Sequence, residues 1–282
     1  MADELKKQQK KEEKELKLLE KQKKKEEKAL KKERKKATDD VEDMLKEERR
    51  NRPLTEEELK IKAQNEPPHL SVLEEIGNSV THGLGAIFGV IALVLMLMKS
   101  TDGKMVLASI VYGVSIFVMM LNSCLYHAWK TGSKVKRIWR RFDYSSIYLL
   151  IGGTFAPLQL IELNANNNVP IYWGYIWFGV MWALIITGIT FTAIFGPGRV
   201  KWINYPLYFT IGWTGLIYLP IWIIHERYAL LFWILGGGIV YTLGMIPFAV
   251  LKGKKSAHFI WHLIVMAGVI IQFIGIYLYV YC

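Results

Sequence analysis

Charged side chains are scarce over most of this 282-residue chain. The first 66 residues hold 22 Lys or Arg and 19 Asp or Glu, whereas the remaining 216 residues hold only 14 basic and 6 acidic side chains. Charged residues therefore make up about 9% of the longer part, against about 25% in a typical globular domain. A segment so poor in charge is too apolar to fold as an ordinary water-soluble core. The composition argues against a cytosolic enzyme.

Cysteine is equally sparse, because the chain has only Cys124 and Cys282. The membrane spans predicted below place these two residues at opposite faces, so a disulfide between them is excluded. Neither cysteine fits a zinc-ligand pattern, and the terminal one is not part of a prenylation motif. The N-terminal region also lacks an apolar stretch behind its basic residues, so we expect no cleaved signal peptide.

Residues 1–66 are predicted to form the first domain, a Lys- and Glu-rich cytoplasmic tail. Leucine is too rare there to sustain a coiled-coil heptad. We expect a solvated tail, mostly disordered or transiently helical, supported by Glu/Lys pairs four residues apart. The interleaved acidic residues leave a net charge of only +3, so we expect no nucleic-acid partner. Anionic lipid is a further candidate partner, but the sequence identifies none.

The second predicted domain, residues 67–282, begins at Pro67 and Pro68 and consists of apolar runs long enough to cross a membrane. A spanning helix needs about 20 residues at a rise of about 1.5 Å each. Short loops that hold nearly all the charge separate seven such runs, at 79–98, 105–126, 144–163, 171–195, 204–224, 228–250 and 258–281. The sequence therefore predicts an all-α integral membrane protein, a bundle of seven transmembrane helices.

Basic residues in the loops predict the orientation of this bundle. One set of alternate loops carries eleven Lys or Arg, namely Lys130, Lys134, Lys136, Arg137, Arg140, Arg141, Arg199, Lys201, Lys252, Lys254 and Lys255. The other set carries three, which are Lys99, Lys104 and Arg227. Since basic loops stay inside, we expect a cytoplasmic N-terminus, an external C-terminus and a multi-pass protein of the plasma membrane.

Ionisable and polar side chains inside the spans are the candidate functional residues, because they are costly at membrane depth. His127 ends the second span, and Ser123 lies one turn before it. Asp143 opens the third span, while His258 and His262 open the seventh on one helical face. With the spans antiparallel, all five fall at nearly the same level on one side.

Three neutral imidazoles at one level predict a zinc site with His127, His258 and His262 as ligands. A fourth position would hold a water that acts as a nucleophile near neutral pH. Asp143 would hold or deprotonate that water, and Ser123 would hydrogen-bond the water, Asp143 or an oxyanion. A purely structural alternative is that the Ser123 hydroxyl donates a hydrogen bond to the backbone carbonyl four residues earlier.

Glu75, Asn78 and His82 lie on one face at the start of the first span. They either cap this span and tie it to its neighbours or support the metal site, and the sequence leaves both interpretations open. His69 and His225 fall in loops and receive no role.

Four segments carry a resemblance to a known family, and they are EEIGNSVTHGLG, SCLYHAWK, RRFDYSSIYLLIGGTFAP and HFIWHLIVMAG. In this order within seven spans, they resemble the hemolysin III group of the progestin and adipoQ receptor family, which is related to the alkaline ceramidases. The resemblance covers about residues 70–282. It implies a seven-helix bundle with zinc on His127, His258 and His262 near the cytoplasmic face, and a water between Asp143 and Ser123.

Two departures limit what this resemblance implies. Members commonly have histidine where this chain has Tyr144, and Gly-Thr-Tyr-Thr-Pro where it has Gly153 to Pro157 as GTFAP. The first leaves the three histidines intact, whereas the second could alter the cavity, so substrate identity is not carried over.

The expected function is that of a zinc-dependent hydrolase acting on a lipid amide or acyl bond at the cytoplasmic side, with membrane lipids as its surroundings and a lipid as substrate or ligand. The alternatives are a membrane sensor, receptor or lipid-homeostasis protein with structural zinc, and a cytolytic protein. A secreted toxin would need a soluble form, which seven apolar spans do not offer.

Overall fold

The computed structural model describes residues 2–163, 172–250 and 256–282, and no strand occurs among them. The chain divides into two compact units, Met1–Leu59 and Lys60–Cys282. The first unit is dominated by α1 (Ala2–Asn51), a single helix of 50 residues. Lysine and glutamate are good helix formers, and glycine and proline are missing before Pro53. An ion pair of 2.9 Å between Glu42 and Lys46 is one of the expected pairs four residues apart.

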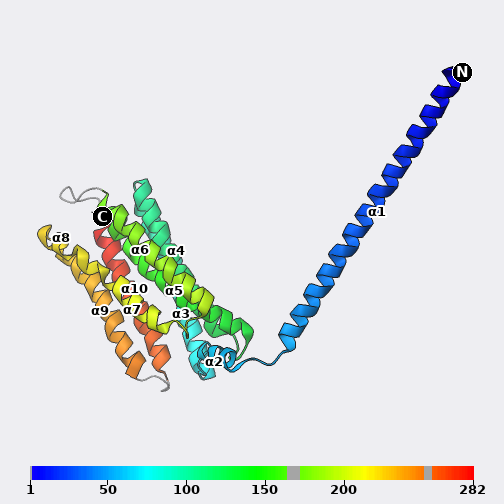
Figure 1. The fold of residues 1–282 in the computed structure, drawn as a ribbon. Coiled ribbons are helices and arrows are strands. Elements are labelled where there is room, and N and C mark those ends of the chain that lie inside the picture. The colour runs from blue at the N-terminus through cyan, green and yellow to red at the C-terminus, as the bar shows by residue number, and fades with distance from the viewer. Residues whose placement is uncertain (1, 164–171, 251–255) are drawn as a thin grey trace. The chain divides into compact units, whose positions relative to one another are not determined.

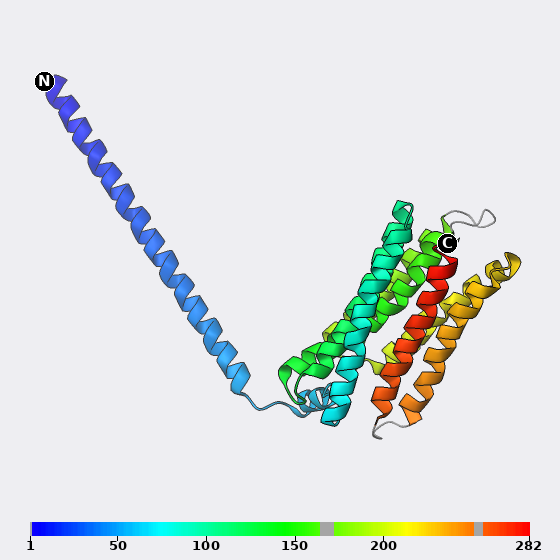
Figure 2. The same cartoon turned by 180° about the vertical axis from the view of Figure 1, so that it is seen from behind.

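The second unit is a bundle of helices packed side by side (Figures 1 and 2). After the short α2 (Glu56–Gln64), which begins in the first unit, come α3 (Val72–Lys99), α4 (Gly103–Ala128), α5 (Lys134–Pro157), α6 (Trp173–Phe195), α7 (Lys201–Gly212), α8 (Leu219–Ile224), α9 (Tyr228–Val250) and α10 (Ala257–Tyr279). A π-helical turn, Leu158–Glu162, extends α5, and a 3₁₀ segment, Trp213–Tyr218, joins α7 to α8. Helix α3 packs against α4 and α10, α5 against α4 and α6, and α9 against α10.

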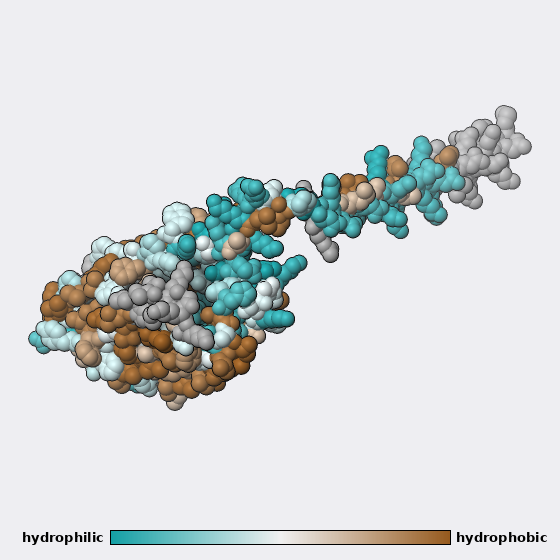
Figure 3. Space-filling model, turned by 90° about the horizontal axis from the view of Figure 1, so that it is seen from below, coloured by the Kyte–Doolittle hydropathy of each residue, from teal (hydrophilic) through white to brown (hydrophobic). Residues whose placement is uncertain are grey.

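Seven of these helical segments are long and apolar enough to cross a membrane, which confirms the predicted number of spans. They are Val72–Lys99, Gly103–Ala128, Lys134–Glu162, Trp173–Phe195, Lys201–Ile224, Tyr228–Met245 and Ala257–Tyr279. Hydrophobic residues cover much of the bundle face seen in Figure 3. Exposed large apolar side chains include Leu84 and Phe232, which are 61% and 71% exposed. Such a surface suits contact with lipid rather than water, and the chain is a multi-pass membrane protein.

Several spans begin earlier than their apolar runs because polar residues cap them. Ser71 and Glu74 form a capping box at the start of α3, seven residues before the predicted apolar run. Ser133 accepts from the backbone N–H of Lys136 and so caps α5. The first turns of these spans are therefore polar, although they continue the same helix.

The fifth span is not one regular helix. Pro220 lies in the first turn of α8 and has no backbone N–H to donate to the preceding turn. The chain meets this by tightening into the 3₁₀ segment, where Gly215 lies against the Phe155 ring of α5. The predicted continuous run at 204–224 is thus built from three pieces.

The two ends of the bundle differ in charge. The basic end comprises the C-terminus of α4, the N-termini of α5, α7 and α10, and the C-terminus of α6, with Lys130, Lys134, Lys136, Arg137, Arg140, Arg141, Arg199 and Lys201. Lys252, Lys254 and Lys255, which also entered the orientation count, lie outside the described residues, as does the predicted start of the fourth span at residue 171.

The far end comprises the opposite termini of these helices. There Arg227 forms a bidentate ion pair with Glu162, with distances of 2.8 Å from Nε to Oε1 and 2.9 Å from Nη2 to Oε2. The same guanidinium donates to the carbonyl of Tyr279 at the end of α10. The hydroxyl of Ser109 in α4 donates to the Tyr281 hydroxyl at 2.9 Å. These contacts join α4, α5 and α10 at the far end.

A short segment after α2 contacts the basic end. Glu66 pairs with Arg137 at 3.1 Å, and its carbonyl accepts from Arg140 at 3.3 Å. The Asn65 amide donates to the carbonyl of Phe195 at 3.1 Å and accepts from the Gly198 N–H at 3.1 Å. Residues 65 and 66, called here the strap, therefore bridge α5 and the loop between α6 and α7.

Candidate metal centre

Three histidines come together at the basic end of the bundle. His127 lies in the last turn of α4, whereas His258 and His262 occupy the first two turns of α10. One ring nitrogen from each lies within 4.8 Å of the others. His127 and His262 are buried, with 2% and 3% of their surface exposed, and His258 is half-buried. The structure thus groups the three residues that the sequence singled out as metal ligands.

The geometry of this group fits a metal ion held by imidazole nitrogens. Zn–N bonds of about 2.0–2.1 Å in a tetrahedral arrangement place two ligand nitrogens about 3.3 Å apart. The Nε2 atoms of His127 and His258 are 3.2 Å apart. Nδ1 of His262 is buried and has no hydrogen-bond partner among the described residues. These three histidines can therefore hold a metal ion.

Asp143 and Ser123 lie next to this group. Asp143, half-buried in α5, lies beside the buried Ser123 hydroxyl and interacts electrostatically with His127. The Ser123 hydroxyl therefore faces the neighbouring helix. A carboxylate and a hydroxyl beside a metal centre can hold a water molecule and a polar group of a ligand.

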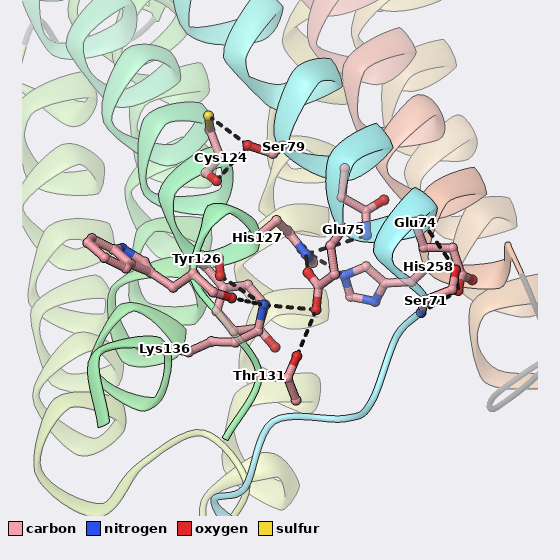
Figure 4. Close-up of polar contacts among 12 residues, drawn as sticks. Ser71, Glu74, Glu75, Ser79, Cys124, Tyr126, His127, Thr131, Lys136 and His258 are labelled. Carbon is pink, nitrogen blue, oxygen red and sulfur yellow. Dashed lines mark hydrogen bonds and ion pairs between the residues drawn. The ribbon is translucent and has the colours of Figure 1, made fainter. Parts of the chain in front are cut away.

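Glu75 of α3 contacts His127 directly (Figure 4). Its Oε2 lies 2.7 Å from Nδ1 of His127. A carboxylate so close indicates that this nitrogen carries the hydrogen and donates it. Nε2 of His127 is then left free of hydrogen to bind a metal. This contact fits both interpretations of Glu75, because it ties α3 to α4 and also touches a histidine of the candidate site.

Asn78 and His82 of α3 also border the centre. Asn78 is fully buried, and its Nδ2 lies 3.5 Å from Nδ1 of His127. His82 stacks on His262 with ring centroids 3.8 Å apart. Both side chains thus border histidines of the site, whereas Ser71 and Glu74 make the cap of this helix.

Lys136 is a site neighbour that the sequence analysis missed, because it was counted only as a loop charge. Its side chain is fully buried, and Nζ lies 2.8 Å from Oε1 of Glu75 (Figure 4). The spacing of Lys136, Arg140 and Asp143 at i, i+4 and i+7 was the available signal, since it places them on one face of α5.

The comparison with known families agrees with the motifs around this centre. The family described as "Haemolysin-III related" matches residues 70–273. The chain belongs to the haemolysin-III-related family. All eight predicted site residues of this family member lie within the matched region, whereas the strap lies before it.

Several relatives of this haemolysin-III-related chain cover most of it. "Hemolysin-3" of Bacillus cereus is 36% identical over 217 residues, which are 74% of this chain and 93% of that protein. "Hemolysin-3 homolog" of Bacillus subtilis (strain 168) is 31% identical over 215 residues, covering 74% and 95%. "Monocyte to macrophage differentiation factor" of Homo sapiens is 24% identical over 212 residues, covering 74% and 85%.

Proposed function

We propose that this protein is a zinc-dependent membrane hydrolase that cleaves an amide or similar acyl bond of a lipid. The observation that carries the proposal is the meeting of His127, His258 and His262 beside Asp143. Three imidazoles with an open fourth position are the ligand set of many catalytic zinc sites. The three histidines would hold the ion, and Glu75 would orient one of them.

The reaction follows from the groups around this ion. When bound, zinc supplies a polarised carbonyl and a water acidic enough to be a nucleophile near neutral pH. Asp143 would accept the proton of that water. The Ser123 hydroxyl is placed to donate a hydrogen bond to the water or to the oxygen that gains negative charge. Apolar packing around the site lowers the local dielectric and strengthens both interactions.

A lipid substrate fits the position of the centre in the helices. His127 ends one membrane span, and His258 and His262 begin another, so the centre lies near one boundary of the apolar layer. The acyl bonds of membrane lipids lie at the same boundary, between the headgroup and the hydrocarbon chains. We further propose that this boundary is the cytoplasmic one, in the plasma membrane, because basic loops stay inside.

A cytolytic role is the second candidate, because the Bacillus cereus relative carries the name "Hemolysin-3". A resident membrane hydrolase could still cause lysis by altering lipids. The two proposals differ in their dependence on the histidines. Channels formed in pure bilayers by the wild type and by a His258→Ala variant alike would support the cytolytic candidate and contradict the hydrolase.

Metal analysis and lipid turnover test the hydrolase together. We expect the purified protein to contain about one zinc per chain and the His262→Ala variant to contain almost none. His225→Ala, at the far end, is the matched control and should keep the metal. An Asp143→Asn variant should keep zinc yet hydrolyse lipid amides at least about 100-fold more slowly. Lipid mass spectrometry on cells expressing each variant measures this loss.

Three outcomes contradict the proposal in different ways. If the purified wild type contains no metal, the proposed zinc site is contradicted. Normal metal in His262→Ala removes this residue from the ligand set. If the wild type contains zinc but hydrolyses no acyl lipid, the metal is structural, and the result supports a sensor or receptor.

A further inference from the structure

Lys136 is an unusual residue for its position, because its ammonium group is fully buried. Its three N–H donors have three acceptors. These are the carbonyl of Tyr126 at 3.1 Å, the carbonyl of Trp129 at 3.0 Å and Oε1 of Glu75 at 2.8 Å. The charge also lies 4.7 Å from the centre of the Tyr126 ring. A buried lysine is tolerated when its donors are satisfied and its charge is paired.

Two of these acceptors are backbone groups that flank a histidine of the metal centre. Tyr126 and Trp129 lie on either side of His127 at the C-terminal end of α4. The last carbonyls of a helix have no partner within the helix, and a positive charge there is favourable. Lys136 thus fixes the backbone that carries His127.

The third acceptor fixes the side chain of the same histidine. Glu75 uses Oε1 for Lys136 and Oε2 for Nδ1 of His127 (Figure 4). Thr131 also donates to Oε1, at 3.3 Å. Each carboxylate oxygen therefore has its own partner, which leaves the carboxylate little freedom to rotate.

We propose that Glu75 and Lys136 act as a positioning pair, in which Lys136 holds Glu75 and Glu75 holds His127 with Nε2 directed to the metal. This inference rests on the proposed metal centre. Neither residue is itself a ligand, because the metal-binding group consists of the three histidines. The carboxylate both fixes the tautomer of His127 and makes its imidazole a stronger donor to the metal.

Zinc affinity of the full-length protein tests this pair, by competition with a chelator. We expect Glu75→Gln to weaken zinc binding about 10- to 100-fold, the usual cost of losing such an outer partner. The absorption spectrum of the Co²⁺-loaded protein should shift as well, since the imidazole becomes a weaker donor. Glu74→Gln is the matched control, because Glu74 neighbours Glu75 but bonds to Ser71 and to the Ser256 N–H.

The control separates positioning from structure. Glu74→Gln weakens the cap of α3, so it should lower the melting temperature of the metal-free protein while leaving zinc affinity unchanged. Equal zinc affinity in Glu75→Gln and Glu74→Gln overturns the inference. A wild type that binds no zinc overturns the proposed function instead, so the two failures are distinguishable.

A double variant tests the order of action. If Lys136 acts through Glu75, Lys136→Gln should weaken zinc binding alone but add less than about twofold in the Glu75→Gln background. Independent, multiplying losses would show that Lys136 does not act through Glu75. If Lys136→Gln fails to fold, the comparison of Glu75→Gln with Glu74→Gln still decides the role of the carboxylate.

Discussion

The hydroxyl of Ser123 illustrates how one residue obtains a role from its neighbours. A serine or threonine inside a membrane helix commonly donates a hydrogen bond to its own backbone, as Thr187 does to the carbonyl of Ala183 at 2.8 Å. The Ser123 hydroxyl lies beside the Asp143 carboxyl of the adjacent helix. This leaves a hydroxyl and a carboxylate side by side next to His127.

Replacing this hydroxyl should affect turnover but not metal binding. We expect Ser123→Ala to keep its zinc and to lower the rate of lipid-amide hydrolysis about 100-fold, as the loss of one donor to a developing oxyanion does. Ser146→Ala is the control, because the Ser146 hydroxyl donates to the backbone carbonyl of Asp143 at 2.8 Å. Equal rates for the two variants would remove Ser123 from the reaction.

At this scale the sequence predicted positions better than partners. The sequence predicted that the three imidazoles meet, because His258 and His262 are spaced four residues apart and lie at the depth of His127. The link from Lys136 through Glu75 to His127 was not predictable, because it depends on how α3, α4 and α5 pack. Helical spacing says which residues share a face and not which side chains meet across helices.

Helix α3, which carries Glu75, is in unusually close contact with helix α4, which carries His127. A Cβ added to Gly89 of α3 would lie 2.7 Å from the backbone nitrogen of Phe117 in α4. A Cβ on Gly113 of α4 would lie 2.8 Å from Cα of Leu93 in α3. Two glycines thus let the backbones approach, as small residues do in membrane bundles.

A methyl group at this contact should separate the two helices. We expect Gly113→Ala to destabilise the protein in detergent by about 1–3 kcal/mol, since the backbone of α3 must shift. Zinc affinity should also fall, because Glu75 moves with α3 while His127 stays with α4. Gly179→Ala in α6 is the control, because nothing lies within 4 Å of its added Cβ. Equal melting temperatures for Gly113→Ala, Gly179→Ala and the wild type in a thermal-unfolding assay would contradict the close contact.

The helices themselves were largely predictable, and the irregular parts were not. Apolar length gave all seven spans, because a bilayer imposes one hydrophobic thickness on every helix. The start of α3 at Val72 was missed because its first turn is polar, although Ser71 and Glu74 carry the capping-box signature. The break in the fifth span depends on how Pro220 is accommodated by its neighbours, which a hydropathy pattern does not contain.

The whole molecule combines a charged helix with an apolar bundle, and the strap belongs to the bundle. Arg140 has 9% of its surface exposed and donates to the carbonyl of Glu66. It also interacts electrostatically with Asp143 at the metal centre. Loss of the strap would therefore leave a buried positive charge without this acceptor, close to the site.

Two truncations separate the tail from the strap. A chain lacking residues 2–59 should keep its zinc content and its melting temperature, because the bundle unit begins at Lys60. A chain lacking residues 2–66 should unfold more easily by about 1–3 kcal/mol, since Arg137 and Arg140 lose their contacts with Glu66. Identical melting curves for the two truncations would show that the strap contributes nothing. Unfolding of both would show that the first unit supports the bundle.

The contacts at the far end hold three helices of the bundle together at a distance from the candidate metal centre. Arg227 joins α5 to α10 there through Glu162 and the carbonyl of Tyr279, and Ser109 joins α4 to the same region through Tyr281. These helices carry Asp143, the two α10 histidines and His127 at their other ends. Helix α10 has 23 residues and is about 35 Å long, so a tilt of about 5° about its far end would move its histidine end by about 3 Å. A small tilt at the far-end contacts would therefore change the spacing of the three imidazoles at the basic end.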